Sequence, residues 1–115
     1  MSDCLFCKIV AGVIPSEKVF ENDKVLGFKD ITPQAKVHAL FIHKEHSRDI
    51  NELVNDDPQQ VTAIFEAINQ YSRDQGLDNE GFRTVTNCGA KAGQSVFHTH
   101  FHVLSGSSFG NFGKI

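Results

Sequence analysis

The chain has 115 residues, of which 40% are hydrophobic and 22% charged, an ordinary composition for one globular domain that buries a core without disulfides. A net charge of -3 argues against a nucleic-acid coat or a basic membrane-surface protein, and no apolar run approaches the length of a membrane span. Three cysteines, an odd number, and a polar, acidic N-terminus indicate a cytoplasmic protein rather than a secreted disulfide scaffold.

The apolar pattern predicts a single domain, residues 1–115, built from short strands and two helices. Asp3 is a suitable N-cap for a short helix that carries Leu5, Phe6 and Ile9 and ends at Gly12. Strands are predicted at residues 18–20, 25–28, 37–42, 82–86 and 96–104, and residues 105–115 form a glycine-rich tail.

The one long helix is predicted to follow the turn Asp56-Asp57-Pro58. Apolar residues recur at helical spacing on one face, namely Val61, Ile64, Phe65, Ile68 and Tyr71. One long helix, a short N-terminal helix and a five-stranded antiparallel sheet together make an α+β fold.

Three of the six histidines, His98, His100 and His102, alternate along the last predicted strand. Side chains on a strand alternate between faces, so the three imidazoles share one face, and the residues between them face the core: Thr99, Phe101 and Val103. Such a row is a polar strand facing solvent, a zinc-binding His-x-His pair, or a reaction centre. The preceding Gly93-Gln94-Ser95 favours a reaction centre, because backbone N–H groups and a hydroxyl suit a phosphate or a developing oxyanion.

Several other positions allow two interpretations from the residues alone. The Cys4-x-x-Cys7 pair has metal-ligand spacing, but two small buried side chains on a helix have the same spacing. Asn87 and Asp30 are either ligand contacts or ordinary turn residues. His38 and His43 lie five apart on one strand, so they face opposite sides and are interpreted as structural.

Residues 93–104 as a whole resemble the signature of the histidine-triad superfamily, in which three histidines alternate with hydrophobic residues. Other segments also resemble the family and occur in the same order along the chain: residues 14–16, 28–34 and 44–46, and Asn87 with its glycine-containing loop. Residues 94–97 and 104–106 are most similar to the Hint branch, the histidine-triad nucleotide-binding proteins. Three features depart from the pattern: Thr99 replaces a hydrophobic residue, His43 replaces a common proline, and the tail lacks a tryptophan.

The resemblance implies a purine nucleotide phosphoramidase or nucleoside monophosphate hydrolase. His100 is then the nucleophile, which attacks the α-phosphorus and forms a covalent nucleotidyl-histidine that water hydrolyses. His102, Gln94 and Ser95 hold the phosphate oxygens, Ser95 also assists the leaving group, and His98 completes the catalytic set.

The resemblance also implies a nucleotide-binding cleft around these histidines. Asn87 and Gly93 lie on its phosphate or ribose side, and Asp30 pairs with the ribose hydroxyls. The purine enters an apolar slot formed by Leu5, Phe6, Ile9, Phe28 and Ile31. From the residues alone the same apolar side chains are simply core.

Some members of the superfamily bind a structural zinc ion, and here its ligands are Cys4, Cys7, His46 and His98. That Cys2His2 set leaves His100 free, and the catalytic step itself requires no cofactor. Members of the family usually form a homodimer through the long helix and a strand, so a homodimer is expected.

Two other functions remain open at this stage. The protein is a nucleotide-binding regulatory protein whose turnover is incidental, or a zinc metallohydrolase that uses the three histidines as ligands. Replacement of His100 tests the first alternative, and activity lost to chelators and restored by zinc tests the second.

Overall fold

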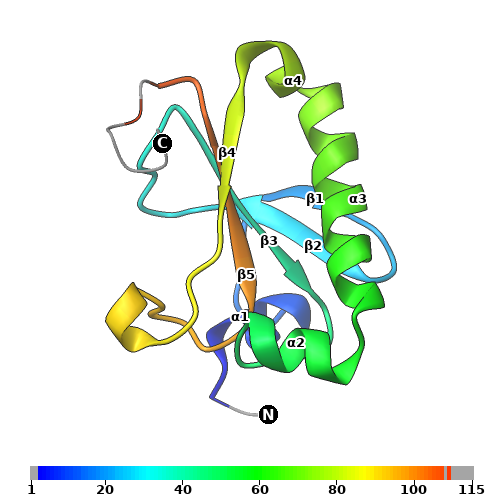
Figure 1. Ribbon diagram of the computed structural model, residues 1–115. Coiled ribbons are helices and arrows are strands. Elements are labelled where there is room, and N and C mark those ends of the chain that lie inside the picture. Colours follow the sequence, from blue (N-terminus) through cyan, green and yellow to red (C-terminus); the bar gives the residue numbers. More distant parts are fainter. Residues whose placement is uncertain (1–2, 108, 110–115) are drawn as a thin grey trace.

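The computed structural model describes residues 3–107 and 109, which form one antiparallel sheet with helices packed against it (Figure 1). The five strands lie in the order β1-β2-β3-β5-β4 across the sheet. Their bounds are β1 (Lys18–Glu21), β2 (Val25–Lys29), β3 (Val37–His43), β4 (Phe82–Val85) and β5 (His100–Ser105). The predicted α+β class and antiparallel sheet are confirmed.

Residues on the two faces of the sheet alternate with the period of two that a strand dictates. One face of β2, β3 and β5 packs against the long helix α3 (Gln59–Asp74), and its core includes Phe41, Phe101 and Val103. The opposite face packs against the short helix α1 (Leu5–Val10), and its core includes Phe28 and Leu40. Because Phe101 and Val103 lie on the α3 face, His100 and His102 lie on the α1 face.

The helices differ from the prediction in their ends and their number. The N-cap of α1 is Cys4 rather than Asp3, because the Cys4 Sγ accepts the Cys7 N–H at 3.3 Å. Helix α2 (Ile50–Asp56), which was not predicted, begins at a carboxylate cap where Asp49 accepts the Glu52 N–H at 3.0 Å. Two further turns were also missed, α4 (Leu77–Glu80) and the 3-10 turn Ala90–Ala92.

The last strand begins at His100, not at residue 96, so His98 lies ahead of the strand. The Thr99 N–H donates to the Ser47 carbonyl at 2.8 Å instead of continuing the ladder with β3. Ser105 belongs to β5 rather than to the tail, and residues 108 and 110–115 of the predicted tail lie outside the described residues. Across residues 3–107 and 109, no helix has the length and apolarity needed to cross a bilayer.

Candidate active site

His100 is held in a single orientation by its own backbone neighbourhood. Its Nδ1 lies 2.8 Å from the His98 carbonyl oxygen, and a carbonyl only accepts, so Nδ1 carries the proton. In the neutral ring Nε2 then holds the lone pair. The side chain is buried, and this burial lowers the pKa of His100 despite the opposing effect of the His98 carbonyl. A neutral imidazole with a free Nε2 is a nucleophile at neutral pH.

His102 is oriented by a second histidine, His38. The Gln34 N–H donates to the His38 Nδ1 at 2.9 Å, so the neutral His38 ring carries its proton on Nε2. That Nε2 lies 2.9 Å from the His102 Nδ1, which therefore accepts, and the proton of neutral His102 resides on its Nε2. Burial, followed by repulsion from His100 and His38, lowers the pKa of His102 to about 4. His102 is thus a neutral hydrogen-bond donor next to a nucleophile.

His38 is a site residue that sequence reasoning missed, since it was interpreted as structural. Its parity in β3 matches that of Leu40, which lies directly opposite His102 in the antiparallel register. Side chains of equal parity share a face, so this alternation was the signal that could have found it. Asp30 extends the chain of contacts, with its Oδ2 3.4 Å from the His38 Nε2. The His43 side chain takes no part in this chain of contacts, because its Nδ1 accepts the Glu45 N–H at 3.2 Å.

A cleft of about 840 Å³ opens over His100 and His102. Its polar lining includes Asp30, Asn87, Gly93 and Ser95, and its apolar lining includes Leu5, Phe6, Ile9, Phe28 and Ile31. The structure therefore brings together ten of the eleven residues expected to bind nucleotide. Phe6 is central, because its ring stands edge-on to His100 at a centroid distance of 5.1 Å. Ile31 is 95% exposed and lies at the rim.

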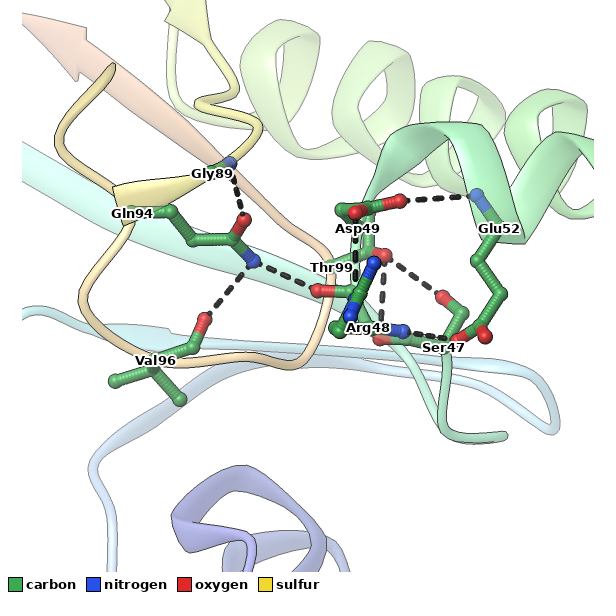
Figure 2. A network of polar contacts seen from close by, with 8 residues as sticks. All are labelled: Ser47, Arg48, Asp49, Glu52, Gly89, Gln94, Val96 and Thr99. Carbon is green, nitrogen blue, oxygen red and sulfur yellow. Dashed lines mark hydrogen bonds and ion pairs between the residues drawn. The ribbon is translucent and has the colours of Figure 1, made fainter. Parts of the chain in front are cut away.

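Gln94 is the residue that does not line the cleft. Figure 2 shows its side-chain amide bound to backbone groups of Gly89, Arg48 and Val96. Its Oε1 accepts the Gly89 N–H at 2.8 Å, while its Nε2 donates to the Arg48 carbonyl at 2.7 Å and the Val96 carbonyl at 3.1 Å. Its own N–H donates to the Gly89 carbonyl. With these groups in use, Gln94 holds the loop that carries Asn87 and Ser95 and has no free donor for a phosphate.

Behind His98 lies a cluster of four candidate metal ligands, Cys4, Cys7, His46 and His98, with ligand atoms within 4.8 Å of one another. The His98 Nε2–H donates to the His43 carbonyl at 2.9 Å, which leaves the His98 Nδ1 unprotonated and directed at the cluster. Burial, and then the adjacent Cys4, raise the pKa of the Cys7 thiol to about 11. This cluster could hold a metal ion, as the family resemblance implied.

The spacing of these ligand atoms fits a tetrahedral ion. A tetrahedral zinc ion with ordinary bond lengths separates sulfur from nitrogen by about 3.5 Å and nitrogen from nitrogen by about 3.3 Å. The His98 Nδ1 lies 3.4 Å from the Cys4 Sγ, 3.5 Å from the Cys7 Sγ and 3.3 Å from the His46 Nδ1. The His46 Nδ1 and the Cys7 Sγ are 3.3 Å apart.

A second set of potential ligands, Asp30, His38 and His102, is less suited to a metal. The His38 Nδ1 accepts a backbone N–H, so a metal on its Nε2 would require the ring to lose both protons. The set works instead as a hydrogen-bonded chain. This arrangement disfavours a metallohydrolase in which the histidines of the cleft are ligands.

Fold and site define a class of protein in which a neutral imidazole faces an apolar cleft on one side of a small antiparallel sheet. Comparison with known proteins identifies the class: the HIT domain matches residues 11–109, and the chain belongs to the HIT family. The histidine-triad resemblance is thereby confirmed.

Two solved structures and one sequence illustrate the relationship. A HIT family hydrolase from Clostridium thermocellum is 41% identical, with a TM-score of 0.90 and 96% of each chain covered. A histidine triad nucleotide-binding protein from Candida albicans is 32% identical, with a TM-score of 0.81, covering 94% of this chain and 82% of that one. An uncharacterized HIT-like protein of Helicobacter pylori is 44% identical over 103 residues, which are 89% of this chain and 95% of the relative. The protein is accordingly a HIT family protein similar to hydrolases.

Proposed function

We propose that this protein is a purine nucleotide phosphoramidase, a hydrolase of phosphoramidate or phosphoanhydride bonds at the α-phosphate that releases a nucleoside monophosphate through a nucleotidyl-histidine on His100. The observation that carries the proposal is the protonation pattern of His100, whose Nδ1–H is bound to a carbonyl while Nε2 is left to attack. In the first step a bond forms between Nε2 and the α-phosphorus, and the bond from phosphorus to the amine or oxygen leaving group breaks. In the second step water attacks phosphorus, the nucleoside monophosphate departs, and His100 regains its lone pair.

The remaining residues of the cleft suit the other parts of a nucleotide. The His102 Nε2–H would be a donor for a phosphate oxygen, and Ser95, which lines the same cleft, would supply a hydroxyl that hydrogen-bonds or protonates the leaving group. Asn87 and Gly93 line the phosphate side, and Asp30 offers a carboxylate to the ribose hydroxyls. The apolar wall around Phe6 suits a purine ring. The similarity to a histidine triad nucleotide-binding protein supports this assignment.

We also propose that Cys4, Cys7, His46 and His98 hold a structural zinc ion. Two thiolates and two imidazoles at tetrahedral spacing are a donor set that zinc prefers. The ion supplies no step of the reaction, because its ligands include neither His100 nor His102.

We further propose that the protein forms a homodimer, because large apolar side chains are exposed on its surface. Phe65 on α3 is 41% exposed and Phe82 on β4 is 38% exposed, although both side chains are large and apolar. β4 is also an edge strand, with a partner only in β5 among the described residues. Exposed apolar groups beside a sheet edge favour association with a second copy.

Intact-protein mass spectrometry after a brief acid quench tests the proposed function. Wild-type protein mixed with an adenosine phosphoramidate should carry an acid-labile adduct of one AMP, and His100→Gly should carry none. Cys88→Ser, a change outside the described cleft lining, is the matched control and should form the adduct like wild type. Turnover without any adduct would refute the covalent mechanism. Binding without adduct or turnover would instead favour a nucleotide-binding regulatory protein.

A further inference from the structure

We propose that the cluster of Cys4, Cys7, His46 and His98 positions the His100 nucleophile, so that metal loading behind the cleft controls the reactivity of His100. The inference rests on the proposed function, since it concerns the same nucleophile. It assigns positioning roles to His46 and His98, which do not line the cleft.

The first connection runs through the backbone of His98. The His98 side chain is fully buried, with one ring nitrogen in the cluster and the other donating to the His43 carbonyl at 2.9 Å. The main-chain carbonyl of the same residue accepts the His100 Nδ1–H at 2.8 Å. His98 precedes β5, so the sheet ladder does not hold this carbonyl in place. The Thr99 N–H of the same peptide group donates to the Ser47 carbonyl at 2.8 Å, so this bond and the anchoring of the His98 ring together set the position of the carbonyl.

The second connection runs through helix α1. Cys4 is both a member of the cluster and the N-cap of α1, because its Sγ accepts the Cys7 N–H. The same helix carries Phe6, whose ring contacts His98 at 6.0 Å and His100 at 5.1 Å between centroids. A bound ion would thus restrain both α1, which carries Phe6, and His98, whose carbonyl binds the His100 Nδ1–H.

Without an ion, the cluster contains few internal restraints. The His98 Nδ1 carries no proton, and its neighbours in the cluster are two thiols and the exposed imidazole of His46. A bound ion would replace these weak contacts with coordinate bonds to Cys4, Cys7, His46 and His98. We therefore expect metal removal to loosen the His98 carbonyl and to let His100 exchange between its two neutral tautomers.

His46→Gln is the informative variant, because His46 is exposed, belongs to the cluster and does not line the cleft. The measurement is the 15N spectrum of the His100 imidazole together with its rate of carbethoxylation by diethyl pyrocarbonate, followed by peptide mass mapping. Zinc-loaded wild type and the control Cys88→Ser should show His100 as a single Nδ1–H tautomer. Metal-free wild type and His46→Gln should show both tautomers, and kcat should fall about tenfold with KM little changed, the usual size of a ligand-orienting effect.

A folded metal-free protein whose His100 tautomer and reactivity equal those of the loaded protein would overturn the inference. If the metal-free protein does not fold, zinc-loaded His46→Gln is compared with zinc-loaded His46→Cys, which restores a fourth ligand. Equal His100 spectra in those two variants would also overturn it. Metal-dependent His100 spectra without any nucleotidyl adduct would instead refute the proposed function alone. An adduct that forms equally with and without metal would leave that function standing and remove this inference.

Discussion

Replacement of His38 by leucine should separate the orientation of His102 from the stability of the fold. His38 is 7% exposed and makes two hydrogen bonds of 2.9 Å, accepting from the Gln34 N–H and donating to the His102 Nδ1. Leucine leaves the Gln34 N–H and the His102 Nδ1 without a hydrogen-bond partner at a partly buried position, which costs at most about 1–3 kcal/mol for each group. Without the His38 donor, no hydrogen bond to Nδ1 favours the His102 tautomer that carries its proton on Nε2. Loss of that oriented donor should lower kcat/KM for a nucleoside phosphoramidate about 10- to 100-fold, equivalent to about 1.4–2.8 kcal/mol of transition-state stabilisation.

The assay is steady-state hydrolysis together with urea unfolding of the same samples. His38→Gln is the conservative variant, because its amide group can still donate to the His102 Nδ1, and it should recover most of the lost rate. His43→Leu is the matched control on the same strand: it also removes a buried imidazole, but one that accepts only the Glu45 N–H. It should cost stability while kcat stays within about twofold of wild type. A His38→Leu protein that is less stable but fully active would refute the reasoning.

Three further predictions concern pH, the core and the loop before β5. Burial lowers the pKa of His100 and lowers that of His102 to about 4, so both rings stay neutral below the ordinary titration point of about 6.5. A pH profile of kcat/KM should therefore stay flat from about pH 8 to 6.5 and fall only at more acid pH. Gly27→Ala would place a Cβ 2.8 Å from the Phe41 ring, so urea unfolding should show a loss of about 1–3 kcal/mol. Thr99→Val removes the 2.7 Å contact between the Thr99 and Ser47 hydroxyls and should cost about 1–2 kcal/mol by the same assay, with an unchanged stability contradicting the pairing.

The sheet could be predicted from sequence because its strands obey a simple period. An apolar run such as Val25 to Phe28 indicates a strand that is buried on both faces. The placement of Phe101 and Val103 in the core follows from the alternation of side chains along β5.

The ends of elements were harder to predict. Cys4 caps α1 through a local bond to the Cys7 N–H, an unusual role for a thiol. β5 begins only at His100 because the Thr99 N–H donates to the carbonyl of Ser47, a residue distant in the chain.

Site residues that belong to the histidine motif could be predicted from sequence. A residue that orients one of them from a distant strand could not. His100, Ser95 and Asn87 stand in or near the histidine motif, and the structure places them around one cleft. His38 lies 64 residues from His102 in sequence, and only the antiparallel register makes the two neighbours. Gln94 was wrongly predicted to bind the phosphate. It lies beside the motif, but its side chain forms hydrogen bonds that hold the loop.

The bend ahead of β5 explains how three similar histidines acquire three different surroundings. A strand running straight through residue 98 would place all three imidazoles in one row, and His98 would face the cleft. Thr99 prevents this, because its N–H and hydroxyl are held by Ser47 and the ladder with β3 starts only at His100. His98 is thereby turned to the cysteines, while its carbonyl still reaches the His100 Nδ1. The hydroxyl of Thr99, the residue that departs from the hydrophobic family pattern, adds a 2.7 Å contact with the Ser47 hydroxyl to the backbone bond that holds this bend.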